Sequence, residues 1–199
     1  MSQESGKKLS LPLRVIIGAV GIVAMVSGFR QCSSGLSEMK GGSEFEALVT
    51  TIDAHVDSGN VAMVAAQPLM MTLLNDVDRL GLSVARQRDS AQAHKANELF
   101  GQSSTHFRMA ASLSGEASAQ DSRESMKPIW ALKLTTFSGL SEVEAINQQI
   151  TALLRDESAT DVKMVTDSIL SSARRRDSLQ LLALNAQTQA NAAVAASKK

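Results

Sequence analysis

The sequence has little of several residue types that fix a fold or a chemistry. Its 199 residues include one cysteine, three prolines and no tyrosine, and aromatic residues make up only 3% of the chain. The single Cys32 excludes an intramolecular disulfide and a multi-cysteine metal site. Strands favour aromatic and β-branched residues, whereas Ala, Leu, Met and Gln suit helices. The composition therefore predicts an all-α fold.

Positive and negative charges are also balanced, with neither sign in excess. Twenty basic and twenty acidic residues give a formal net charge of zero. Four of the cations and one of the anions lie within residues 1–30, so the rest of the chain has a net charge of −3. Nucleic-acid binding needs a basic surface that displaces the counterions of the phosphates. We therefore expect no nucleic-acid partner.

One apolar segment, residues 11–29, stands out near the start of the chain. As a helix at about 1.5 Å per residue it would be roughly 28 Å long, close to the hydrocarbon thickness of a bilayer. Three cations lie toward its N-terminal side and Arg30 follows it, which favours a cytoplasmic N-terminus. We expect residues 11–30 to form a single transmembrane signal-anchor in the cytoplasmic (inner) membrane. Residues 1–10 would be cytoplasmic and the bulk of the chain periplasmic.

Two other interpretations of this segment stay open. A cleavable signal peptide has the same layout, and the string VSG at residues 26–28 offers small residues for cleavage. A lipoprotein would retain Cys32 as an acylated residue, but a charged Arg30 stands where such signals have small residues. A retained anchor is therefore the favoured interpretation.

The rest of the chain shows helical periodicity between turn signals. A Ser/Gly-rich linker at residues 31–42 comes first, and residues 194–199 are expected to fray. Gly81 is expected to weaken a helix without ending it. Ser141 and Glu144 have the spacing of an N-terminal capping box. From apolar spacing, caps and turn residues we expect helices at about 43–57, 61–100, 106–113, 128–137, 141–155 and 161–193.

Two pairs of repeated strings indicate how these helices are organised. SVARQRDSAQ at 83–92 matches SSARRRDSLQ at 171–180 in seven of ten positions, and SGLSE occurs at both 34–38 and 138–142. Each SGLSE is followed in the same order by a short expected helix, a turn and a long helix, which indicates a duplicated helical hairpin. The two hairpins would pack as a four-helix bundle with coiled-coil-like contacts. They would span residues 43–137, with connecting helices, and residues 138–193.

The repeated strings also supply the candidate docking residues. Within each string an arginine and an aspartate lie three residues apart, where such a pair contributes only about 0.2–0.5 kcal/mol. Shared ancestry with two solvated faces is the simpler interpretation. The alternative is that the arginines bind carboxylates or lipid head groups of a partner. The candidate partner-docking residues are Arg86, Arg88, Asp89, Arg174, Arg176 and Asp177.

The sequence contains no motif of an enzyme. His55, His94 and His106 form no HExxH or CxxCH pattern, and no GxSxG nucleophile elbow is present. A haem held by one histidine and one methionine stays open, although methionines at these spacings are typical of a core. The methionines concerned are Met63, Met70, Met71, Met109 and Met164. We expect no catalytic residue, no metal and no cofactor.

These features together predict a non-catalytic, membrane-anchored helical scaffold or accessory subunit of a larger membrane protein assembly. Its partners would be other membrane proteins, and a homo-oligomer stays open. The alternative is an extracytoplasmic sensor bundle that binds a small ligand between its helices and acts through a partner protein.

Overall fold

The computed structural model describes residues 43–156, 158 and 161–197. This part of the chain forms four α-helices and one 3-10 turn, and it contains no strand: α3 (Ser43–Leu80), α4 (Leu82–Gln120), η1 (Glu124–Met126), α5 (Lys127–Arg155) and α6 (Val162–Ser197). The predicted all-α bundle is confirmed. None of the described helices is long and apolar enough to cross a bilayer, and the expected anchor at 11–30 lies outside the described residues.

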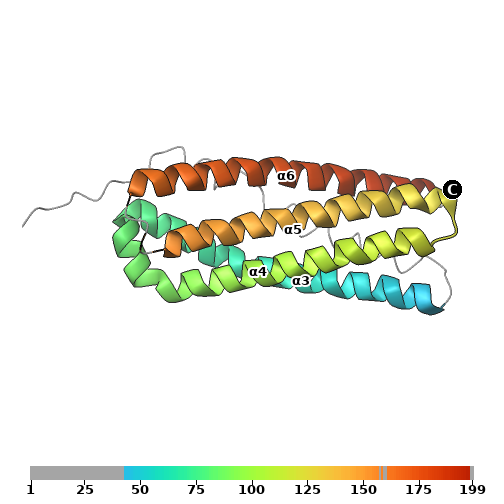
Figure 1. Ribbon diagram of the computed structural model, residues 1–199, viewed down its shortest axis with the longest axis horizontal. Helices are drawn as coiled ribbons and strands as arrows, with labels where there is room; N and C mark the ends of the chain where they lie inside the picture. The colour runs from blue at the N-terminus through green and yellow to red at the C-terminus, as the bar shows by residue number, and fades with distance from the viewer. Residues whose placement is uncertain (1–42, 157, 159–160, 198–199) are drawn as a thin grey trace, which may run out of the picture.

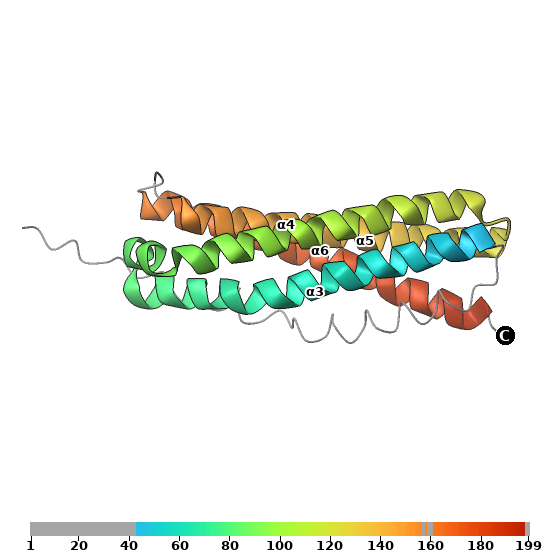
Figure 2. The ribbon, with the colours of Figure 1, turned by 90° about the horizontal axis from the view of Figure 1, so that it is seen from below.

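The helices pack as an elongated antiparallel bundle in which each helix contacts the next in the chain. In Figure 1, α6, α5, α4 and α3 follow one another across the molecule. Figure 2 shows that α6 crosses the other helices obliquely, and that its C-terminal end lies at the same end of the bundle as the start of α3. The partner along which α6 chiefly packs is α5. One side of α6 is therefore a side of the whole molecule.

The glycines of the first hairpin have roles opposite to those that the sequence suggested. The expected turn near Gly59 does not exist, because α3 continues through it and a Cβ there would lie 3.1 Å from the Phe107 ring of α4. Gly81, in contrast, ends α3 with a φ of 87°. An L side chain rarely adopts this backbone conformation, so glycine is suited to this turn. The expected single helix over 61–100 is therefore wrong.

Three further helix boundaries also differ from expectation. α4 continues through Gly101 to Gln120, with one departure from helical geometry at Asp89 (φ −112°, ψ 19°). α5 does not stop before Gly139, where a Cβ would lie 3.1 Å from the Cβ of Ala183 on α6. Here too the missing side chain permits close helix packing instead of a turn. The boundary expected between the hairpins at residue 138 falls within α5.

The turn between α5 and α6 agrees with the sequence. α5 ends at Arg155, and Asp161 caps α6 by accepting hydrogen bonds from the backbone N–H groups of Lys163 (2.9 Å) and Met164 (3.2 Å). A carboxylate at this position satisfies N–H groups that have no partner inside the helix.

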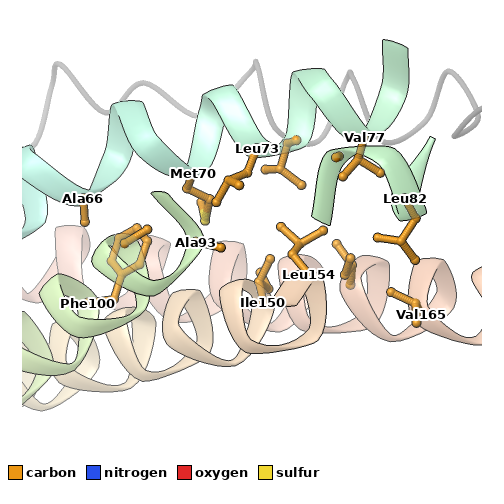
Figure 3. Close-up of a cluster of buried hydrophobic side chains, with 14 of the residues drawn as sticks. Ala66, Met70, Leu73, Val77, Leu82, Ala93, Phe100, Ile150, Leu154 and Val165 are labelled. Carbon is orange, nitrogen blue, oxygen red and sulfur yellow. The ribbon is translucent and has the colours of Figure 1, made fainter. Parts of the chain in front are cut away.

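The core consists of two apolar clusters along the bundle. Phe45 and Trp130 meet edge to face with ring centroids 5.9 Å apart in the first cluster. Figure 3 shows the second cluster, in which side chains of α3 point toward those of α4 and α5. The first part of α3 buries an apolar stripe formed by Phe45, Val49, Ile52 and Val56. Farther along the chain, Val61 and Val64 of α3 and Val84 of α4 are exposed.

Candidate functional site

The first repeated string joins α4 to the end of α5. Arg86 donates from Nε to the carbonyl of Leu154 at 3.0 Å and from Nη2 to the carbonyl of Leu153 at 2.9 Å. These carbonyls belong to the last turn of α5, where a cation also complements the helix dipole. Arg86 therefore has a structural role within the bundle.

Asp89 belongs to a network of two carboxyl groups and two arginines. Arg79 donates to Asp76 at 2.8 Å, and Arg88 lies 3.7 Å from Asp76 and 3.6 Å from Asp89. The Arg79 hydrogen bond lowers the pKa of Asp76. Burial, with the neighbouring Asp76 carboxyl, raises the pKa of Asp89. Like charges this close disfavour double ionisation, so the pair holds a proton more readily than two separate aspartates would.

The second string lies in a different environment from the first. Arg176 is buried, with a side chain only 10% exposed, whereas 54% of the Arg88 side chain is exposed. Nε and Nη2 of Arg176 both donate to Oδ1 of Asp177, at 3.0 and 2.7 Å. Arg174 is exposed. Equivalent positions of the two strings therefore do not form equivalent surfaces.

A polar layer that the sequence did not reveal lies between α5 and α6. Glu144 is 1% exposed, and its carboxylate accepts one long hydrogen bond, from Nδ2 of Asn147 at 3.5 Å. Burial raises its pKa from 4.5 to about 8, although Asn147 and the charge of Arg176 act in the opposite direction. Oδ1 of Asn147 is buried without a hydrogen-bond partner among the described residues.

The expected capping box at Ser141 and Glu144 is therefore wrong. Both residues lie in the middle of α5, and the hydroxyl of Ser141 donates to the backbone carbonyl of Ser104 on α4 at 2.9 Å. A capping box satisfies N–H groups at a helix N-terminus, and no helix begins at Ser141. Glu144 is instead buried in the interior.

The antiparallel register of α5 and α6 places Arg176 opposite Glu144. Gly139 packs against Ala183, and Glu142 lies 3.6 Å from Arg175, so residue numbers fall along α6 as they rise along α5. Gln180, one turn beyond Arg176, is also buried. From Ala173 onward the buried residues of α6 are therefore small or polar, whereas Val165 and Ile169 nearer its start are large and apolar.

Two of the three histidines meet between α3 and α4. The Nδ1 atoms of His55 and His106 lie 3.0 Å apart, and their ring centroids lie 5.3 Å apart. The distance between the centroids exceeds the distance between the Nδ1 atoms by about the sum of two imidazole ring radii. The two nitrogens therefore lie between the rings and point at each other. This geometry suits one shared proton, whereas a chelated metal needs lone pairs that converge on a third point. Burial, then the His55 charge, lowers the pKa of His106.

The other candidate ligands are dispersed. Among the described residues, no group of three or more His, Cys, Asp or Glu side chains is placed to hold a metal ion. Nη1 of Arg155 donates to Nδ1 of His94 at 3.0 Å. Met63 and Met70 are buried, whereas Met109 and Met164 are largely exposed.

The outer side of α6 carries large apolar side chains. Leu181, Leu182 and Leu184 are 59%, 61% and 41% exposed, and we call these three residues the α6 apolar patch. Residues 178–197 of the same helix contain no charged residue. Solvated helix faces normally carry charges, and the cores of protein interfaces are depleted of them.

Comparison with known protein families, curated proteins and solved structures finds no match to this chain.

Proposed function

We propose that this chain is a non-catalytic scaffold or accessory subunit, held at the cytoplasmic membrane by residues 11–30, whose helical bundle binds other membrane proteins from the periplasmic side. The apolar run with cations at both ends supports the anchor and its orientation. The bundle would stand beside the membrane on the linker at 31–42.

The observation that carries this proposal is the surface of α6. Its apolar patch lies within a stretch of twenty helical residues, 178–197, that contains no charged residue. Within residues 178–197 the buried positions are taken by Gln180, Ala183, Ala186, Gln187 and Ala190. Three leucines of this stretch are thus exposed while its buried positions hold small or polar residues, as expected where a partner covers the leucines.

The proposal includes descent from a duplicated hairpin. α3 with α4, and α5 with α6, form two antiparallel pairs, and each repeated string lies in the second helix of its pair, at the start of α4 and toward the middle of α6. The different environments of Arg88 and Arg176 fit two copies that have diverged in their packing. Of the six candidate docking residues, Arg88 and Arg174 are exposed enough to serve a partner.

Site-specific photo-crosslinking tests the partner surface. A photo-reactive amino acid would replace Leu182 in the full-length chain within native membranes, and the matched control would replace the exposed Thr50 on α3. We expect defined crosslinked species, with constant partners by mass spectrometry, at Leu182 and not at Thr50. Equal crosslinking at both positions, or none at either, would contradict the proposed surface.

Membrane extraction tests the anchor separately. Alkaline carbonate should leave the full-length chain in the membrane pellet, because a spanning helix resists extraction that removes peripheral proteins. A variant lacking residues 11–29 should appear in the supernatant. Release of the intact chain by carbonate would exclude a transmembrane anchor while leaving the surface of α6 to be judged by crosslinking.

A further inference from the structure

Arg176 has two carboxyl groups within its surroundings. It donates twice to Asp177, its neighbour on α6, and the α5–α6 register brings it opposite Glu144. Its positive charge acts on Glu144 although no direct ion pair joins them among the described residues. One buried cation therefore has one carboxyl partner on its own helix and a second across the interface.

The surroundings of Glu144 fit the neutral acid better than the carboxylate. An ionised carboxyl in a buried site costs several kcal/mol unless it is paired and well hydrogen-bonded. Glu144 has a single long hydrogen bond from Asn147. A protonated Glu144 could donate to Oδ1 of Asn147 after rotation of the amide, and this is the buried atom that has no partner among the described residues.

No other charge competes with Arg176 at this level of the bundle within the described residues. Ser104 bonds Ser141, and Gly101 faces the side chain of Gln148, so α4 meets this level of α5 at residues 101–104, which are uncharged. The nearest charges on the α4 side are Lys95 and Glu98, which pair with each other at 3.0 Å and are exposed.

The remaining titratable groups nearby are also accounted for. On α5 itself, Glu142 is exposed and faces Arg175. α3 meets this level of α4 near residues 61–63, which are uncharged. The His55–His106 pair lies more than a turn farther along α4, and the pKa of His106 is lowered rather than raised.

We propose that Arg176 exchanges carboxyl partners according to the protonation of Glu144. It pairs with Asp177 while Glu144 is neutral. When Glu144 releases its proton to solvent, the guanidinium turns to Glu144 across the α5–α6 interface, and Asp177 becomes a free surface carboxylate. The exchange replaces a pair within α6 by a buried pair between α6 and α5, so it changes how the helix that carries the apolar patch is held. This inference does not depend on the proposed function.

Infrared titration of the full-length protein in detergent tests the protonation step. A protonated carboxyl has a carbonyl band of its own, so the band should persist through neutral pH and disappear in the weakly alkaline range, where burial places the pKa of Glu144. Glu144→Gln should remove the part of this band that disappears in the weakly alkaline range, whereas any contribution from Asp89, whose pKa burial also raises, should stay. If Glu144→Gln removes no part of the band that the wild type shows above pH 6, the proposal is overturned.

Asp177→Asn tests the exchange itself. Without its partner on α6, Arg176 is available to Glu144 at all pH values, so the titration midpoint should fall by about one pH unit or more. Asp167→Asn, an exposed aspartate on the same helix, is the matched control and should leave the midpoint unchanged.

The Nε–Hε signal of Arg176 in nuclear magnetic resonance spectra provides a second readout. It should shift with the midpoint of the Glu144 band in the wild type and lose this shift in Glu144→Gln. If the titration midpoint does not move in Asp177→Asn, the guanidinium keeps one partner and the exchange is excluded. The same follows if the Arg176 signal does not change when Glu144 loses its proton.

Discussion

At the scale of single residues, the informative side chains are polar groups in buried places. Helix packing buries Glu144, and contacts between helices bring together the His55–His106 pair and the Asp76–Asp89 pair. The partners of His55 and Asp76 lie too far away in sequence for residue spacing to reveal them. Glu144 has the spacing of a capping box with Ser141, so its burial could not be recognised from the sequence. Sequence patterns report periodicity along one helix, whereas these sites depend on the register between helices.

Glu144 should make the protein less stable as the pH rises. The folded state keeps a proton on this carboxyl up to a pKa of about 8, whereas the unfolded chain loses it near 4.5. The free energy of unfolding should therefore fall between these pH values. Glu144→Gln should remove this slope and raise stability at pH 7 by about 2–3 kcal/mol. Urea unfolding at several pH values measures this, with the exposed Glu142→Gln as a control that should change nothing.

Asp121 should have the opposite pH dependence. Its carboxylate accepts two hydrogen bonds from the Arg123 side chain at 2.8 Å and one from Nε1 of Trp130 at 3.0 Å. Burial acts to raise its pKa, but the hydrogen bonds outweigh it and lower the pKa to about 2. Its contribution to stability is present above 3.8 and is lost as the pH falls toward 2.

Asp121→Asn tests this contribution directly. The substitution should reduce stability at pH 7 by about 2 kcal/mol, because charge-assisted hydrogen bonds to a buried group are lost. It should also remove the loss of stability on acidification. Fluorescence of Trp130 monitors the unfolding, since it is the single tryptophan. Unchanged stability at pH 7 would show that the amide replaces the carboxylate fully.

At the scale of helices, the glycines account for most of the boundary errors. Gly59, Gly101 and Gly139 lie inside helices, and at each of them an added Cβ would meet a side chain of the neighbouring helix. Gly81 has the positive φ of a true helix end. A sequence shows the glycine but not whether it permits a turn or a close contact. The final turn was predictable because the Asp161 cap acts within its own helix.

Two glycine substitutions should have opposite effects. Gly81→Ala forces an L side chain into a φ of 87° and should destabilise the fold by about 1–2 kcal/mol. Gly115→Ala lies in α4, where an added Cβ meets nothing within 4 Å, and should stabilise it by about 0.5–1 kcal/mol. Thermal unfolding of both variants compares them directly. If the two substitutions change the stability equally and in the same direction, the backbone conformation at Gly81 does not determine the effect of an added side chain.

The contact between α3 and α4 at His55 and His106 should weaken in acid. A second proton on the pair places two N–H groups head to head, and the lowered pKa of His106 means that the folded state resists this protonation. Stability should thus be complete above the unfolded histidine value of 6.5 and decrease as the pH falls below it. His106→Gln should lose this acid dependence, whereas His94→Gln should retain it. Denaturant titrations at pH 5 and pH 7.5 distinguish the two results.

At the scale of the whole molecule, the all-α bundle followed from composition and periodicity, which average over many residues. The packing of the second half of α6 did not, because its buried positions are Ala, Gln and Arg while Leu181, Leu182 and Leu184 are exposed. Spacing alone does not distinguish the exposed Leu182 from the partly buried Leu179 three residues earlier, whereas the packing of α6 does.

The outward leucines should therefore matter for binding and not for folding. Replacing Leu181 and Leu182 together by serine removes apolar area that is already exposed, so stability should change by no more than about 0.5 kcal/mol. Leu140→Ala, at a fully buried position of α5, should instead cost about 2–5 kcal/mol. The double variant should retain the thermal unfolding curve of the wild type while losing the partners that crosslink at the α6 surface. If the double variant unfolds as easily as Leu140→Ala, the leucines stabilise the bundle itself; if it keeps every partner, the binding surface lies elsewhere on the molecule.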